Sequence, residues 1–232
     1  MDIVGHRGAC GHAPENTLRS FAKAITLGCQ RVELDVHVSA DGVPVVIHDD
    51  TLDRTTSGKG SVRTLTLAEL KKLDAGNGEN IPTLGEVMEL CCGKVELQIE
   101  LKDRRSPPLV AELIQKRWDR CKVVITSFDV ALLDEFARRM PDIPLGLLNR
   151  DPNLDMISLA KGRGHRWICP RFNIVSQELV NRAHAANVLV YVYHVNDRQI
   201  AKDLIMWKVD AIGTDYPELV SNMVSSMEKR PN

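Results

Sequence analysis

Short apolar runs alternate with amphipathic stretches along the 232-residue chain. Eight of these runs have the length and hydrophobicity of buried strands. We expect strands at residues 3–5, 31–38, 95–101, 122–126, 144–148, 167–170, 188–193 and 211–214. Between and after them, apolar residues three and four positions apart predict helices. We expect the helices around 18–25 and 109–114 and over 83–91, 131–140, 154–161, 177–186, 197–208 and 218–228, with Asn16 or Thr17 capping the first.

Regular alternation of strand and helix predicts a parallel sheet with crossover helices. Eight such units in a chain of this length are typical of a closed (β/α)8 TIM barrel, and a doubly wound open sheet is the alternative. We expect one domain over residues 1–232. The segment 43–80 departs from the pattern: Asp41-Gly42 predicts a hairpin turn into a strand at 43–47, and Ser-, Thr- and Gly-rich sequence without a clear helix follows. We interpret it as a small insertion after the second strand.

Composition and charge narrow the class of protein. Lys and Arg number 30 and Asp and Glu 31, a formal net charge of −1, which gives no overall attraction to nucleic acid or to an anionic membrane. No apolar run approaches the length that spans a bilayer, and the first residues do not resemble a secretion signal, so we expect a cytoplasmic protein without membrane insertion. The six cysteines have neither zinc-site nor CxxC spacing, and we expect them to be reduced.

Carboxylates gather on two of the predicted strands. Glu33 and Asp35 are two positions apart and therefore share one face of the strand 31–38. Strict alternation around the third strand places four polar residues on one face, namely Glu96, Gln98, Glu100 and Lys102. Inward-facing carboxylates are costly unless they are paired or bound to metal, and oxygen ligands favour Mg²⁺, Ca²⁺ or Mn²⁺. The same pattern also fits ion-paired residues in a hydrated barrel interior or on an exposed strand face.

Two histidines flank these carboxylates in the predicted arrangement. His6 ends the first strand, and His48 ends the hairpin after the second. A single histidine is more often structural than catalytic, but a pair beside a carboxylate cluster suits general acid and general base catalysis. Arg7 is suited to an anionic oxygen, and Lys102 is either a second cation for that role or a solvated lysine at a strand end.

A series of motifs in this order resembles the glycerophosphodiester phosphodiesterases. The motifs are Gly5-His6-Arg7-Gly8, Pro14-Glu15-Asn16-Thr17, Glu33-Leu34-Asp35-Val36, Asp41-Gly42, His48-Asp49, Arg54-Thr55-Thr56, Ile81-Pro82-Thr83-Leu84 and Glu100-Leu101-Lys102. The similarity continues more weakly through Thr126-Ser127-Phe128 and Val195-Asn196 to Gly213-Thr214-Asp215-Tyr216-Pro217. It therefore covers nearly the whole chain.

The resemblance implies a metal-dependent enzyme that hydrolyses glycerophosphodiesters, small-molecule substrates, to sn-glycerol 3-phosphate and an alcohol. By position, the implied site residues are Glu33, Asp35 and Glu100 for one divalent cation (Mg²⁺ or Ca²⁺), His6 and His48 for acid–base catalysis, Arg7 and Lys102 for phosphate, and Glu15 in a supporting role. In such relatives the glycerol 2-hydroxyl is thought to attack the phosphate, giving a cyclic phosphate that water opens.

One departure from the family pattern leaves the contacts to headgroup and glycerol open. Many relatives carry a tryptophan shortly before the Val-Asn pair, where this chain has Tyr193-His194. A lysophospholipid or sphingolipid substrate and a catalytically silent phosphate-binding barrel are the alternatives, whereas the ordered motifs argue against a sugar isomerase. The sequence leaves unassigned the oligomeric state, the headgroup, which histidine is acid and which base, and whether His12, His37 and Asp215 approach the site; for His37 a structural role is favoured.

Overall fold

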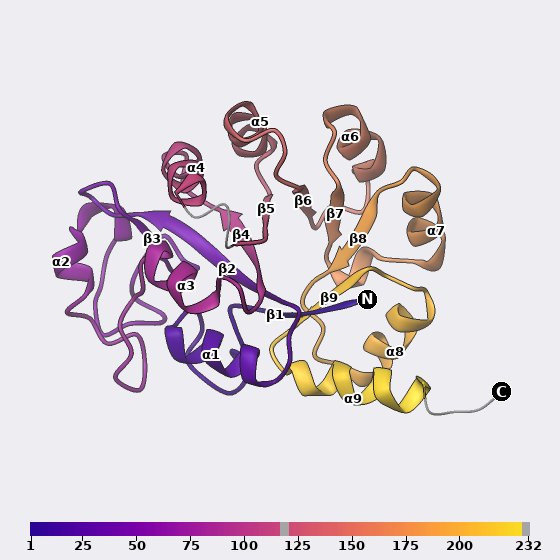
Figure 1. Ribbon diagram of the computed structural model, residues 1–232, viewed down its shortest axis with the longest axis horizontal. Helices are drawn as coiled ribbons and strands as arrows, with labels where there is room; N and C mark the ends of the chain where they lie inside the picture. Colours follow the sequence, from indigo (N-terminus) through magenta and orange to yellow (C-terminus); the bar gives the residue numbers. More distant parts are fainter. Residues whose placement is uncertain (117–120, 229–232) are drawn as a thin grey trace.

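The computed structural model describes residues 1–116 and 121–228; the remaining residues of the predicted 1–232 domain lie outside this description. Eight parallel strands form a ring inside a layer of helices (Figure 1). The parallel strands are β1 (Asp2–Gly5), β2 (Arg31–Val38), β4 (Glu96–Leu101), β5 (Val123–Ser127), β6 (Leu145–Asn149), β7 (Trp167–Pro170), β8 (Leu189–Val192) and β9 (Ala211–Thr214). Because β1 pairs in parallel with both β2 and β9, the sheet closes on itself. The TIM barrel is confirmed, and the open-sheet alternative is wrong.

Helices follow the strands and cover the outside of the barrel. They are α1 (Leu18–Thr26), α3 (Leu84–Cys91), α4 (Ser106–Gln115), α5 (Val130–Arg139), α6 (Met156–Arg163), α7 (Gln177–Ala185), α8 (Arg198–Met206) and α9 (Pro217–Glu228). Most begin at a side chain that accepts from a free main-chain amide, as Thr17 accepts from Ser20 N at the start of α1. Thr17 therefore caps α1 as expected. Asn16, the other candidate cap, turns instead toward the barrel interior.

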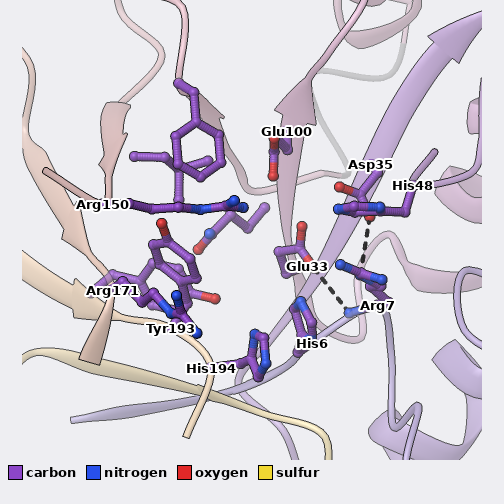
Figure 2. Close-up of a pocket in the computed structure, with 14 residues that line it drawn as sticks. His6, Arg7, Glu33, Asp35, His48, Glu100, Arg150, Arg171, Tyr193 and His194 are labelled. Carbon is purple, nitrogen blue, oxygen red and sulfur yellow. Dashed lines mark hydrogen bonds and ion pairs between the residues drawn. The ribbon is translucent and has the colours of Figure 1, made fainter. Parts of the chain in front are cut away.

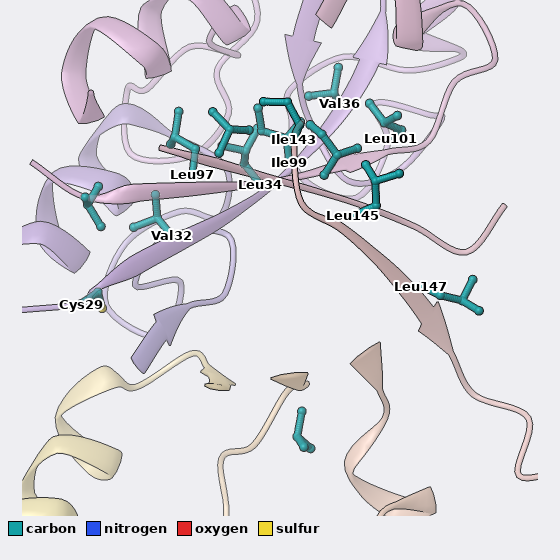
Figure 3. Packing of buried hydrophobic residues seen from close by; sticks show 14 of the residues in the cluster. Cys29, Val32, Leu34, Val36, Leu97, Ile99, Leu101, Ile143, Leu145 and Leu147 are labelled. Carbon is teal, nitrogen blue, oxygen red and sulfur yellow. The ribbon is translucent and has the colours of Figure 1, made fainter. Parts of the chain in front are cut away.

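The two faces of β2 and β4 have different surroundings. Their apolar residues point outward into the main core beneath the helices, as Figure 3 shows for Val32, Leu34, Val36, Leu97, Ile99 and Leu101. Their polar residues point into the barrel, where Glu33, Asp35, Gln98 and Glu100 are all buried. A second apolar cluster, which includes Trp167, Tyr191 and Tyr193, fills another part of the interior. The alternation of apolar and polar residues along these strands thus separates an apolar outer layer from a partly polar barrel interior.

The insertion extends from β2. After the hairpin turn, in which Gly42 has a φ of +81°, β3 (Pro44–Val46) pairs antiparallel with β2. The expectation that no helix follows is wrong, because the short helix α2 (Leu67–Leu70) begins at a capping box formed by Thr66 and Glu69, and a 3-10 turn, η1 (Val62–Thr64), precedes it. A separate apolar cluster holds the insertion together: Val45, Ile47, Leu52, Val62, Leu70, Ala75 and Ile81. This packing fixes the segment that carries His48.

Two cysteines differ from the expectation. Cys92, at the end of α3, and Cys121, just before β5, form a disulfide with their Cα atoms 4.6 Å apart. The prediction of reduced cysteines is wrong at these two positions, because the folded chain brings together residues 29 positions apart in sequence. Cys10, Cys29, Cys91 and Cys169 have free thiols.

No helix in the described part of the chain is both long and apolar enough to cross a bilayer. The cytoplasmic location stays a prediction.

A buried arginine closes the barrel at the end opposite the strand C-termini. Arg31, the first residue of β2, is 2% exposed, and its guanidinium lies 4.6 Å from the centre of the Trp167 ring. Its Nε lies 2.6 Å from Glu96 Oε2, and its terminal nitrogens reach Asp2 at 3.2 Å and Gln98 at 3.3 Å. We therefore expect Arg31 to stabilise the fold at this end of the barrel and to take no part in catalysis.

We expect Arg31→Met to lower the free energy of unfolding by about 2 kcal/mol, because it leaves Glu96 unpaired beside the core. Glu96 is partly exposed, which keeps the cost below that of a fully buried pair. Urea denaturation measures the loss. Arg166→Met, an exposed residue at the same end of the barrel, is the control and should change stability by less than about 0.5 kcal/mol. A large fall in turnover with unchanged stability would contradict this assignment.

Candidate active site

A cavity of about 190 Å³ opens at the C-terminal ends of the barrel strands (Figure 2). Its walls come from the loops and strand ends of β1, β2, β4, β5, β6, β7 and β8, and from the insertion. The lining includes six of the predicted site residues: His6, Arg7, Glu33, Asp35, His48 and Glu100. This is the end of a TIM barrel at which functional side chains gather.

Three buried carboxylates lie together in the lining of this cavity. Glu33 and Asp35 come from β2 and Glu100 from β4, and the parallel register pairs Asp35 directly with Glu100. One oxygen of each carboxylate lies within 4.8 Å of the others. All three residues are less than a tenth exposed. The chemistry is that of a hard-cation site, because every ligand atom is an oxygen.

Burial and mutual repulsion act on the ionisation of these groups. The pKa of Glu33 is raised well above its ordinary value by burial and by the charges of Asp35 and Glu100. Burial and the charge of Asp35 raise the pKa of Glu100 to about 7. Burial also opposes ionisation of Asp35, but the cations of Lys102 and Arg7 hold its pKa below the ordinary range. The cluster is thus short of positive charge, and a divalent cation fits that deficit.

Arg7 enters the site through a strained turn. It has a φ of +51°, and its main-chain N–H donates to Glu33 Oε2 at 2.9 Å. Its side chain donates to Glu15 at 2.7 Å and its Nε lies 3.5 Å from Asp35. The next residue, Gly8, has a φ of +84°, and a Cβ there would lie 2.6 Å from the Ser20 main chain. Only glycine fits this position, which lets the loop deliver Arg7 to the carboxylates.

The loops that carry Arg7 and His48 are joined by a network of charges. Glu15 accepts from Arg7 and from Arg54 of the insertion, and Arg54 also donates to Asp49 at 2.7 Å. From the same loop Asn16, which is buried, donates to Asp35 at 2.8 Å. The network holds one loop against the other across the edge of the cavity.

Each of the two predicted catalytic histidines is oriented by an aspartate. His6 Nδ1 lies 2.7 Å from Asp215 Oδ1, and His48 Nδ1 lies 2.5 Å from Asp49 Oδ1. The hydrogen bond from Arg54 lowers the pKa of Asp49; burial opposes ionisation of Asp215, but hydrogen bonds from His6 and Cys10 lower its pKa. An ionised carboxylate only accepts, so Nδ1 of each ring carries a proton and Nε2 is the nitrogen left for substrate. Burial lowers the pKa of His48.

Lys102 has a different place from Arg7. Its ammonium lies 3.3 Å from Asp35 and 3.2 Å from Glu100, and it lines two hollows beside the cavity but not the cavity itself. The structure therefore places Lys102 as an ion-pair partner of the carboxylates, on the outer side of the cluster.

Several residues of the site escape the sequence interpretation. Asp215 is one, because its contact with His6 spans 209 residues and depends on barrel closure. The ring of His194 stacks on that of His6 with the centroids 4.5 Å apart, and burial and the charge of His6 lower the pKa of His194 to about 4. Arg150 and Arg171 also line the cavity. Both directly follow strands, β6 and β7, and that position was the available signal.

The other candidate histidines lie outside the cavity. His37 Nε2 is 3.1 Å from the main-chain oxygen of His48, so it supports that loop, as the favoured structural interpretation expects. His12 contacts Glu218 at 2.9 Å and packs edge-on against Tyr216.

Comparison with known families agrees with this geometry. A model of the glycerophosphoryl diester phosphodiesterase family matches residues 6–219, which is most of the chain. The chain belongs to this family. It is 35% identical over 235 residues to a glycerophosphodiester phosphodiesterase of Caldanaerobacter subterraneus subsp. tengcongensis, covering 96% of this chain and 97% of the relative. The enzyme class expected from the motifs is confirmed.

Solved structures of family members share the fold along their whole length. A phosphodiesterase of Oleispira antarctica, in complex with the product sn-glycerol-3-phosphate, superimposes with a TM-score of 0.92 at 30% identity and 97% coverage of each chain. A glycerophosphodiester phosphodiesterase of Thermotoga maritima gives a TM-score of 0.85 at 28% identity, covering 96% of this chain and 98% of that one.

The raised carboxyl pKa values predict that a divalent cation stabilises this phosphodiesterase more at pH 8 than at pH 5.5. In the folded protein without metal, Glu100 keeps its proton up to about pH 7, whereas the unfolded chain releases it near 4.5, so its burial costs stability as the pH rises between these values. Metal binding needs the ionised form, so protons compete with metal at low pH.

Thermal unfolding measures the effect. At pH 8, Mg²⁺ or Ca²⁺ at 100 times its Kd should raise Tm by about 5–10 °C. Glu100→Gln should abolish most of the shift. Equal shifts in Tm at the two pH values would contradict the prediction.

Proposed function

We propose that the chain hydrolyses glycerophosphodiesters to sn-glycerol 3-phosphate and the free alcohol, with one divalent cation, Mg²⁺ or Ca²⁺, held by Glu33, Asp35 and Glu100. The observation that carries the proposal is the convergence of these three buried carboxylates with two aspartate-oriented histidines in one cavity. Membership of the family and the product complex of the Oleispira antarctica relative support the reaction.

In this proposal the bound cation supplies Lewis-acid stabilisation of charge on the phosphate oxygens. Arg7, fixed by Glu15, binds a further non-bridging oxygen through a guanidinium that stays charged at every working pH. Lys102 holds Asp35 and Glu100 in place, and its charge favours the ionised form of Asp35. Each of these groups is in place before substrate arrives, so little reorganisation is needed during the reaction.

His6 and His48 move the protons. One accepts a proton at Nε2 from the attacking hydroxyl, and the other donates a proton from Nε2 to the leaving alcohol oxygen. Asp215 and Asp49 hold the rings and stabilise whichever is the imidazolium. Burial lowers the pKa of His48, which favours the neutral ring, the form that accepts a proton.

Release of sn-glycerol 3-phosphate from glycerophosphocholine tests the proposal directly. We expect release with Mg²⁺ or Ca²⁺ and none with a chelator, measured by a coupled glycerol 3-phosphate dehydrogenase assay. His6→Ala and His48→Ala should each lower kcat by about 10²–10⁴, the usual contribution of a positioned acid or base, with little change in Tm.

His184→Ala removes an exposed histidine that contacts Asp210 and does not line the cavity, so it is the matched control for general effects of a His→Ala change on the fold. Unchanged kcat in either histidine variant would remove that residue from the mechanism. No release from folded, metal-loaded protein with any headgroup would overturn the proposed reaction and favour a lipid substrate or a silent binding barrel.

A further inference from the structure

Two arginines form the wall of the cavity across from Arg7. Arg150 directly follows β6 and Arg171 directly follows β7, and both side chains extend into the cavity from the side away from His48 and Arg7 (Figure 2). Arg7, by contrast, is held by Glu15 and Asp35. Among the described residues, no carboxylate forms an ion pair with Arg150 or Arg171 within 4.0 Å. Their charges are therefore available to a ligand.

Aromatic side chains pack behind Arg150 in this wall. The Arg150 guanidinium lies 4.6 Å from the centre of the Phe128 ring. The Phe128 ring packs edge-on against the Tyr193 ring, with the two ring centres 6.1 Å apart. Tyr193 is buried and donates its hydroxyl proton to the Asn149 main-chain oxygen at 3.2 Å. Arg150 also hydrogen-bonds the Tyr193 side chain, and because a guanidinium has five N–H donors, further donors remain for an anion.

The main chain links the two arginines. Arg171 N donates to Asn149 O at 3.0 Å, so the residue before Arg150 is bonded directly to Arg171. Arg171 also forms a parallel bridge with Tyr193, and its guanidinium lies 5.6 Å from the Phe172 ring. The two cations thus sit on adjacent, connected strand ends and not on independent loops.

A simple glycerophosphodiester gives these two cations nothing to neutralise. Its one negative charge is on the phosphate, which the proposed function assigns to the carboxylate-bound cation and Arg7. The glycerol is uncharged. His194, between this wall and His6, has a pKa lowered to about 4 and adds no charge at neutral pH. Two further fixed cations in the same cavity match a second anion on the substrate.

We propose, on the basis of the proposed function, that Arg150 and Arg171 form a subsite for an anionic group, carboxylate or phosphate, on the alcohol esterified to glycerol phosphate. Guanidinium groups bind both anions through paired N–H donors. The subsite makes the enzyme selective for acidic leaving alcohols over neutral or cationic ones.

Matched pairs of substrates test the subsite. Glycerophosphoserine and glycerophosphoethanolamine differ only by a carboxylate, and glycerophosphoinositol 4-phosphate and glycerophosphoinositol only by a phosphate. We expect kcat/KM to be higher for the anionic member of at least one pair by about tenfold, which is the size of one charged hydrogen bond. Selectivity in the first pair alone identifies a carboxylate ligand, and selectivity in the second pair alone identifies a phosphate.

Arg150→Gln and Arg171→Gln should each reduce that selectivity about three- to tenfold, mainly through KM of the anionic member. Arg166→Gln is the matched control. Arg166 is exposed at the other end of β7, so its replacement changes the net charge equally but should leave the ratio of the two substrates unchanged.

Two results would overturn the subsite. One is an equal kcat/KM for the two members of both pairs with the unmodified enzyme. The other is an equal loss of kcat/KM on every substrate in the two variants, which would place the arginines on the shared glycerol phosphate. Calorimetric affinities for the same four compounds separate this proposal from the proposed function. Selective binding without turnover would support the subsite and overturn the reaction. Turnover without selectivity would support the reaction and overturn the subsite.

Discussion

The burial of three carboxylates within 4.8 Å of one another is the constraint on which the rest of the site depends. Removing one such group from water is costly, and three together also repel each other. Four groups offset part of this cost by contacting the carboxylate oxygens: the side chains of Lys102 and Arg7, the Arg7 main-chain amide and the Asn16 side-chain amide. These donors still leave the pKa values of Glu33 and Glu100 raised. In the proposed function, a bound divalent cation supplies the missing positive charge. The same charge deficit therefore underlies the structure of the site and its proposed chemistry.

Barrel closure supplies the second condition for the proposed mechanism. His6 follows β1, and Asp215, which orients it, follows β9, so the two meet only because the first and last strands pair. His48 depends in the same way on the insertion, whose Arg54 ties Asp49 to Glu15. The residues expected to serve stability and those proposed for catalysis lie at opposite ends of the barrel, with Arg31 at one end and the carboxylates at the other.

The sequence predicts strands and the convergence of Glu33, Asp35 and Glu100 well, because alternation sets the face of a residue and parallel pairing sets its neighbour. It does not predict contacts that need closure, such as His6 with Asp215, or the Cys92–Cys121 disulfide. The four-residue helix α2 escapes because it is too short to show periodicity. Arg150 and Arg171 escape because an arginine after a strand has the same local pattern whether it faces a cavity or solvent.

The most direct test of this account is to locate the cation. Crystals grown with Mn²⁺, a substitute for Mg²⁺ with strong anomalous scattering, give its position without reference to turnover. The account predicts one strong peak within about 2.5 Å of an oxygen from each of Glu33, Asp35 and Glu100. The cluster of His6, Cys10 and Asp215 offers an internal comparison, since its ligands are softer. A peak there with none among the three carboxylates would contradict the account.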